Sequence, residues 1–130
     1  MENAYTSMTH KEEVIFTGRL TDNDLQNITA SAFAITYVSL FEGFGIPIIE
    51  AMNCNVPVIT SNVTSMPEIA GDAALLCDPF SILSIRDAMI KIYSDQNLRT
   101  TLIEKGKLRA DFFSWEKTAA GLWNCIKKCF

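Results

Sequence analysis

Glu42-Gly43-Phe44-Gly45-Ile46-Pro47-Ile48-Ile49-Glu50 carries the clearest structural signal in this chain, because it predicts a loop that leads directly into a helix. Its two glycines permit tight turns and close approach of a ligand, and its proline suits the first turn of a helix. The preceding run, residues 32–38, is apolar enough for a strand buried on both faces. Glu42 is therefore expected at the carboxyl end of a strand and Glu50 about one turn into the helix, in the crevice where open α/β sheets bind ligands.

The two carboxylates suggest a ligand with hydroxyl groups on either side of a phosphate. The helix start offers free N–H groups and a positive dipole end to an anion. Each carboxylate can accept hydrogen bonds from neighbouring hydroxyls, which suits a diphosphate that carries a sugar at each end. The alternative is that both acids are solvated surface groups. The binding hypothesis is favoured by the apolar sequence neighbours of Glu50, which are Ile48, Ile49, Ala51 and Met52.

Further motifs follow in a fixed order from about position 13 to position 119. They are Val14-Ile15-Phe16-Thr17-Gly18-Arg19-Leu20, Phe41 to Pro47 with Glu50-Ala51-Met52, Val56-Pro57-Val58-Ile59-Thr60-Ser61, Met66-Pro67-Glu68-Ile69-Ala70-Gly71-Asp72-Ala73-Ala74 and Phe113-Ser114-Trp115. In this order the chain resembles the retaining, nucleotide-sugar-dependent glycosyltransferases of GT-B architecture, glycosyl transferases group 1. The resemblance implies a Rossmann-like doubly wound parallel sheet that forms the incomplete C-terminal half of a GT-B enzyme.

The resemblance also implies roles for individual residues. Glu50 would hold the ribose hydroxyls, and Glu42, the candidate catalytic residue, would hold the donor sugar. Backbone amides between the two glutamates, those of Gly43, Phe44, Gly45 and Ile46, would contact the donor sugar and the phosphates. The backbone of Gly18, Arg19 and Leu20 would lie near the base. Sugar transfer to an acceptor hydroxyl with retention, without a metal or other cofactor, is expected, and the acceptor would be bound by an N-terminal domain that this chain lacks.

Basic side chains are missing from the middle of the chain. No lysine or arginine lies between Arg19 and Arg86. The same interval holds seven acids, which are Asp22, Asp24, Glu42, Glu50, Glu68, Asp72 and Asp78. Departure of a diphosphate normally needs a cationic clamp where no metal is used. In the resembling enzymes an arginine and a lysine lie upstream, so this chain alone is expected to be inactive. Glu68 is interpreted as a surface or structural acid.

Composition and charge exclude several classes of protein. A length of 130 residues suits one domain, and a net charge of −4 without a basic run argues against a nucleic-acid partner. The sequence lacks a membrane-spanning segment and a signal-peptide core, which predicts a cytoplasmic location, with peripheral membrane association of a longer parent as an option. The four cysteines are scattered and His10 is the single histidine, so no metal site is predicted.

Alternating strand and helix signals predict a polar leader over 1–12 and a partial nucleotide-sugar-binding domain over 13–130 that ends in helices. Strands are expected at 13–17, 32–38, 57–60 and 73–77. Helices are expected from Thr21, Pro47, Met66, Ser81, Leu98 and Ser114. The helix from Met66 is expected to stop at Gly71, and Asn55 is expected to allow the left-handed turn into the strand that follows. Apolar stripes on these helices should pack on the sheet or on neighbouring helices. An unpaired strand edge and uncovered helix faces would favour self-association.

Two other functions remain open. A non-catalytic nucleotide-binding module fits the same loop and helix. A sugar-nucleotide epimerase of the same two-domain architecture would need an acid–base pair that the sequence does not show. A receiver-type regulatory domain is the weakest alternative, because no acidic cluster accompanies an aspartate at a strand end.

Overall fold

The computed structural model describes residues 2–129 and contains a three-stranded parallel sheet. The strands are β1 (Ile35–Tyr37), β2 (Val58–Ser61) and β3 (Ala74–Cys77), in the order β1-β2-β3. Ile35 pairs with Val58, and Val58 pairs with Ala74. Every residue of the central strand β2 is buried, whereas β1 and β3 are partly exposed.

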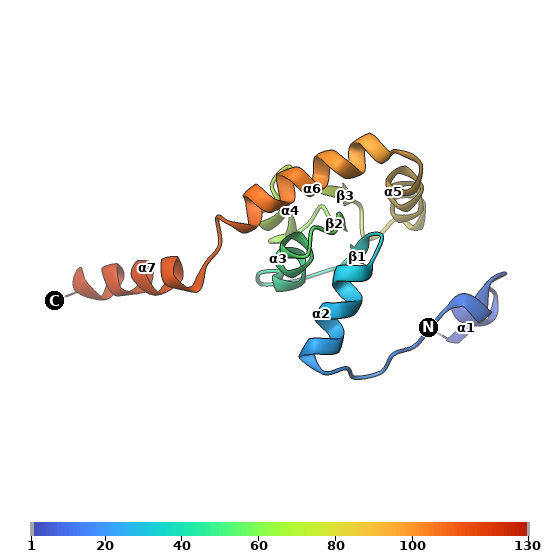
Figure 1. The fold of residues 1–130 in the computed structure, drawn as a ribbon, viewed down its shortest axis with the longest axis horizontal. Coiled ribbons are helices and arrows are strands. Elements are labelled where there is room, and N and C mark those ends of the chain that lie inside the picture. Colours follow the sequence, from blue (N-terminus) through green and yellow to red (C-terminus); the bar gives the residue numbers. More distant parts are fainter. Residues whose placement is uncertain (1, 130) are drawn as a thin grey trace.

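Helices cover both faces of this sheet (Figure 1). The helices of the body are α2 (Asp22–Ser31), α3 (Ile46–Asn53), α4 (Met66–Ala70), α5 (Ile82–Ser94) and α6 (Gln96–Ala110). Val58 belongs to a core cluster with α3 and α4, and its neighbour Ile59 belongs to a second cluster with α5. Because successive strand residues face opposite sides, this division confirms the predicted doubly wound α/β layers.

Several predicted ends of helices are confirmed at the residues that predicted them. The Thr21 hydroxyl accepts a hydrogen bond from the Asp24 amide at 3.2 Å and begins α2. Gly71, with a φ of 57°, ends α4, and Asn55, with a φ of 60°, makes the left-handed turn before β2. Gly106 lets α6 approach α3, because a Cβ there would lie 3.2 Å from the Met52 side chain.

The predicted strand at 13–17 is wrong. The structure has a short 3₁₀ helix, η1 (Lys11–Glu13), followed by an irregular segment in which Ile15 and Phe16 are exposed. Within residues 2–129 no strand lies alongside this segment, so its backbone groups have no ladder to join. For a similar reason the predicted strand at 32–38 shortens to β1 and is only half-buried, since it forms an edge of the sheet.

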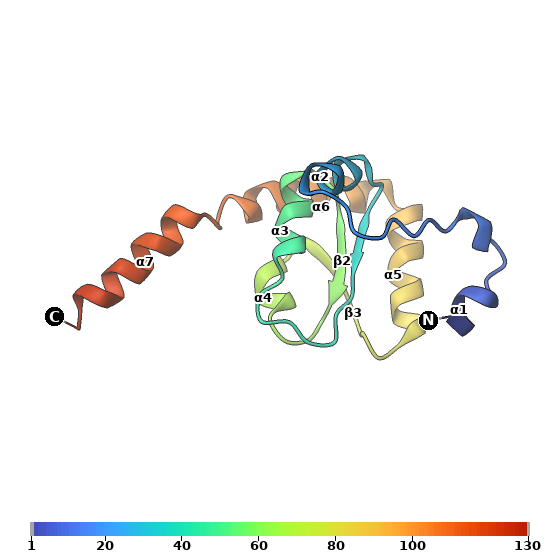
Figure 2. The same ribbon diagram turned by 90° about the horizontal axis from the view of Figure 1, so that it is seen from below.

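Several predicted apolar stripes are not buried. On α2, Leu25 and Ile28 are each about half exposed, and α5 buries Ala88 and Ile92 rather than Ile82. The stripe of α7 (Trp115–Lys127) is not buried: Trp115 is 81% exposed, and the helix extends away from the body in both views (Figures 1 and 2). Amphipathic spacing identifies the face of a helix that needs cover, but it does not identify the partner.

The N-terminal segment also lies apart from the sheet. It contains α1 (Glu2–Thr6) and η1, at the opposite end of the molecule from α7 (Figures 1 and 2). Across residues 2–129, none of the helices combines the length and the apolar character needed to cross a bilayer.

Candidate functional site

Glu42 follows β1 at the carboxyl edge of the sheet, and two hydroxyls hold its carboxylate. Tyr37 Oη donates a hydrogen bond to Glu42 Oε1 at 2.7 Å. The single proton of the Ser39 hydroxyl is shared between the same oxygen, at 3.1 Å, and the Phe41 carbonyl oxygen, at 3.2 Å. The hydrogen bond to the Glu42 carboxylate, together with desolvation, raises the pKa of Tyr37. Both bonds end on Oε1, so Oε2 keeps its capacity to accept hydrogen bonds from a ligand.

The loop after Glu42 turns into α3 at a glycine that no other residue could replace without strain. Gly45 is the N-cap of α3 and has a φ of 116°, and a Cβ at this position would lie 2.9 Å from Met66 Cε. The Ile48 amide donates to the Gly45 carbonyl at 3.0 Å, which closes the first turn. Gly43 is exposed and has open space around it, so the backbone is accessible to a ligand there. The sequence correctly predicted this loop-to-helix unit.

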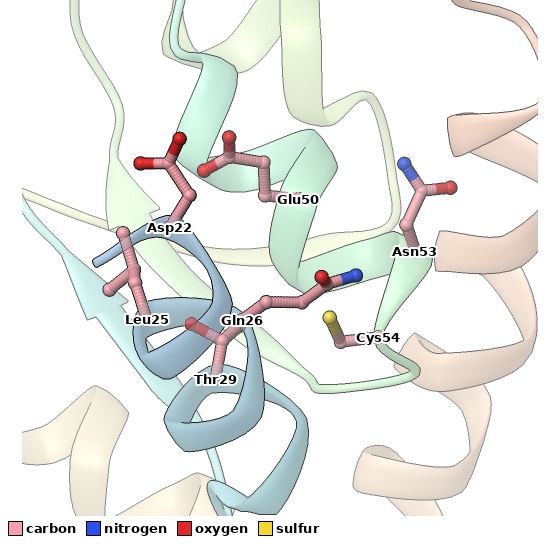
Figure 3. Close-up of a pocket in the computed structure, with 7 residues that line it drawn as sticks. All are labelled: Asp22, Leu25, Gln26, Thr29, Glu50, Asn53 and Cys54. Atoms are coloured by element: carbon pink, nitrogen blue, oxygen red, sulfur yellow. The ribbon is translucent and has the colours of Figure 1, made fainter. Parts of the chain in front are cut away.

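Glu50 lies on the side of α3 that faces α2. Its side chain is exposed, in contrast to the apolar setting that its sequence neighbours suggested, because those neighbours point into the core. It borders a cavity of about 390 Å³. The lining residues are Asp22, Leu25, Gln26, Thr29, Glu50, Asn53 and Cys54 (Figure 3). This volume lies within the range of small-molecule sites.

Figure 3 shows Glu50 and Asp22 together at one end of the cavity, on α3 and α2 respectively. Gln26 extends from α2 toward Cys54 at the other end. The lining includes two carboxylates and no lysine or arginine. The cavity can therefore offer hydrogen-bond acceptors to hydroxyl or amino groups, but no side-chain cation to a phosphate.

The remaining predicted residues lie at different places around this cavity. Glu42 is not part of its lining, so the two glutamates occupy separate positions before and after the loop. Gly18, with a φ of 63°, and Arg19 are exposed in the segment that leads to α2. Leu20 is half-buried, two residues before Asp22. In the structure, the segment that contains Gly18 and Arg19 reaches the cavity only at its last residues, next to Asp22, and Arg19 itself does not line the cavity.

Sequence reasoning missed the residues that hold the loop. Tyr37 and Ser39 are hydroxyl-bearing residues at the end of the strand that precedes Glu42, a signal that was available in the sequence. Ser65 gave no such signal. Its hydroxyl lies 2.9 Å from the Glu42 carbonyl oxygen and 2.9 Å from the Phe44 carbonyl oxygen, across more than twenty residues of chain.

Potential metal ligands gather at one place in residues 2–129, away from this loop. His10, Glu12 and Glu13 carry ligand atoms within 4.8 Å of one another, and all three side chains are exposed at η1. Neither Glu42 nor Glu50 belongs to such a group.

Comparison with known proteins gives concordant matches. The family model described as Glycosyl transferases group 1 matches residues 2–109. The O-antigen chain mannosyltransferase B of Escherichia coli is 40% identical over 112 residues, and the serotype-specific mannosyltransferase WbdA of the same organism is 36% identical over 109 residues. The sucrose-phosphate synthase structure from Thermosynechococcus elongatus superimposes with a TM-score of 0.85 at 27% identity.

These matches cover most of this chain but a small part of each relative. They include 86%, 84% and 99% of this chain, against 29% of the mannosyltransferase B, 13% of WbdA and 33% of the sucrose-phosphate synthase chain. The chain therefore spans about a third or less of the proteins it matches.

Proposed function

The chain belongs to the glycosyl transferases group 1 family, and on that basis we propose that it is the donor-binding portion of an enzyme that transfers a sugar from a nucleotide-diphosphate sugar to an acceptor hydroxyl. We assign the acceptor site to the part of the protein outside this chain, because the chain spans only 29% of mannosyltransferase B. Retention at the anomeric carbon and independence from metals are included in the proposal on the strength of the sequence resemblance.

One observation carries this proposal: Glu42 is held by Tyr37 and Ser39 at the strand end, where the backbone turns into α3. An acid fixed by two donors on one oxygen has lost much of its rotamer freedom, so it can accept from a sugar hydroxyl at a reduced entropic cost. The start of α3 then offers amides to the phosphates. In this arrangement Glu42 receives the donor sugar and Glu50, more than one turn further on, receives the ribose.

The cavity beside Glu50 supports the ribose assignment. Its two carboxylates are acceptors only, which suits the vicinal hydroxyls of a ribose and disfavours a phosphate. We place the base toward the segment that contains Gly18, Arg19 and Leu20, because that segment leads directly to Asp22 at the cavity. The phosphates would then lie between the cavity and Glu42, over the amides of residues 43–46.

The leaving diphosphate needs more positive charge than this chain offers at the cavity. Helix N-termini contribute about 0.3–1 kcal/mol per charge at exposed sites and up to about 2 kcal/mol when partly buried. Lys105 is paired with Asp72 at 2.7 Å, and Arg109 donates to the backbone of α4, including the Ile69 carbonyl at 2.9 Å. We therefore propose that basic side chains elsewhere in the full-length protein complete the site, and that this chain alone acts as a nucleotide-binding module.

The names of the relatives point to a mannosyl donor as the first to be tested. Both Escherichia coli relatives are described as mannosyltransferases. The test is calorimetric titration of this chain with guanosine, uridine and adenosine diphosphates and with their mannose and glucose conjugates. Saturable binding of at least one nucleotide is expected, and the mannose conjugate should bind most tightly. Absence of binding by every nucleotide to both this chain and its full-length parent would reject the proposed function.

We also propose self-association of the isolated chain. β1 and β3 form the edges of the described sheet, and the apolar residues of α7 are exposed, including Leu122 and Trp123. Unpaired strand edges and apolar helix faces both promote contacts between copies. Size-exclusion chromatography at several concentrations tests this, and a monomer at every concentration would contradict it. A cytoplasmic location remains part of the proposal.

A further inference from the structure

The loop formed by residues 42–45 is held by two residues that are distant in the sequence. The Ser65 hydroxyl lies 2.9 Å from each of two loop carbonyl oxygens, those of Glu42 and Phe44. In addition, the Phe44 ring packs edge-to-face on Phe113, with centroids 5.8 Å apart and planes at 85°. Phe113 is itself half-buried against the core cluster that contains α3. The loop is thus attached to both α4 and the segment after α6.

Ser65 differs in its bonding from other serines at helix starts in this chain. Ser81 and Ser114 are N-cap residues whose hydroxyls accept a hydrogen bond from the amide three residues later. Ser65 is the N-cap of α4, yet its hydroxyl makes no such bond. The hydroxyl is directed to the loop instead, so its contribution is to the loop conformation rather than to its own helix.

The Glu42 and Phe44 carbonyls share the single proton of the Ser65 hydroxyl, and their direction determines where the loop amides point. In a trans peptide the C=O and the following N–H lie in one plane and point in opposite directions. No cis peptide occurs in residues 2–129. Because the Glu42 and Phe44 carbonyls both face Ser65, the amides of Gly43 and Gly45 face away from it. These are amides of the turn to which a donor phosphate or sugar is assigned above.

We propose that Ser65 is a positioning residue for the donor loop, and that together with Phe113 it sets the direction of the Gly43 and Gly45 amides. This inference rests on the proposed donor-binding role of residues 42–46. Ser65 itself contacts no substrate in this arrangement. Its hydroxyl acts through the peptide planes of the loop, and Phe113 limits the movement of the Phe44 ring.

The first test uses the ligand-free chain, so it does not depend on the donor. Nuclear magnetic resonance spectra are compared for wild type, Ser65→Ala, Ser65→Thr and the matched control Ser114→Ala. Because the Phe113 ring packs edge-to-face on Phe44, its ring current should shift the resonances of the Phe44 ring in wild type. In Ser65→Ala we expect these resonances and the Gly43 and Gly45 amide shifts to move toward random-coil values. Ser65→Thr and Ser114→Ala should keep them.

Wild-type shifts in Ser65→Ala would overturn the inference, as would equal losses in Ser65→Ala and Ser65→Thr, which retains the hydroxyl.

The second test titrates the same variants with the nucleotide sugar that wild type binds. Ser65→Ala should bind about fivefold more weakly, the factor expected for one neutral hydrogen bond, and Ser114→Ala should bind as wild type does. Unchanged binding in Ser65→Ala would also overturn the inference. Failure of wild type to bind counts against the proposed function, and the spectra still decide the role of Ser65.

Discussion

Tyr37 Oη donates a hydrogen bond to Glu42 Oε1 over 2.7 Å, so the last residue of β1 fixes the acid that follows the strand. Tyr37 is itself anchored to β2, because its carbonyl accepts from the Thr60 hydroxyl at 2.8 Å. Thr60 is fully buried in the central strand. The position of Glu42 is therefore determined by the sheet rather than by the loop alone, and this relationship can be tested by removing one hydroxyl.

Tyr37→Phe should destabilise the protein while leaving the ring packing in place. The substitution removes one hydrogen bond to a carboxylate at a half-buried site, and we expect a loss of about 1 kcal/mol in the free energy of unfolding. Urea unfolding monitored by far-ultraviolet circular dichroism measures it, because both tryptophans lie on the exposed α7 and do not report on the sheet. Tyr93→Phe is the matched control, since the Tyr93 side chain is 79% exposed. Equal effects of the two substitutions would show that the Tyr37 hydroxyl contributes nothing specific.

The same hydrogen bond predicts a dependence on alkaline pH. Its carboxylate partner raises the pKa of Tyr37 above the usual value of about 10. The folded state holds the phenol proton more tightly than the unfolded state does. The stabilisation of the folded state by this hydrogen bond is therefore fully present below about pH 10 and is lost as the pH rises through the raised pKa of Tyr37. The stability difference between wild type and Tyr37→Phe should thus be constant from neutral pH to about pH 9 and then shrink. A difference that grows above pH 10 would contradict this sign.

Glu50→Gln should weaken nucleoside diphosphate binding. A ribose hydroxyl that donates to a carboxylate contributes roughly 1.5–3 kcal/mol, and the exposure of Glu50 favours the lower end of that range. Calorimetric titration of the chain measures the loss. Glu68→Gln is the control, because Glu68 is an exposed acid on α4 outside the cavity lining. If Glu50→Gln binds as tightly as wild type, the ribose assignment is wrong.

Glu42 should matter for the sugar more than for the nucleotide. In the full-length protein, Glu42→Ala is expected to reduce turnover more than it reduces affinity for the nucleoside diphosphate product, because Glu42 precedes the loop whereas Glu50 follows it. Steady-state kinetics and product titration supply the two quantities. Parallel losses in both would indicate that Glu42 acts only by holding the loop, through its bonds to Tyr37 and Ser39.

Elements with a strong local signal were predictable from the sequence. The glycine–proline pattern placed α3 within one residue, and Gly71 placed the end of α4. Each of these signals acts through the backbone of neighbouring residues, so its effect does not depend on which parts of the fold pack around it. The family resemblance rested on the same segments, and the family match confirms it.

Features that depend on distant partners were not predictable. The segment 13–17 has strand-forming composition, but a strand also needs a neighbour with which to pair, and none lies beside it in residues 2–129. The stripe of α7 lacks a covering surface in the same way. Ser65 contacts residues more than twenty positions away, and nothing in its local sequence distinguishes it from a capping serine. The exposure of Glu50 also follows from the packing of α3 rather than from its neighbours.

The isolated chain should transfer no sugar, and a longer version that contains the upstream part of its parent should be active. The sequence from Arg19 to Arg86 holds seven acids and no intervening base, and the cavity beside α3 is lined by Asp22 and Glu50 without a cation. Charge that develops on a departing diphosphate needs stabilisation of several kilocalories per mole, which is the usual role of arginine and lysine clamps. The start of α3 alone supplies too little.

Release of nucleoside diphosphate from a panel of nucleotide sugars measures this difference between the two proteins. The longer protein should show turnover, and the isolated chain should show binding without turnover. Comparable rates in both would reject the incomplete-site hypothesis. Arg19 and Arg86 would then be the first residues to substitute, each by alanine, because they bound the interval without basic side chains. Loss of activity in either variant would identify the source of the missing charge.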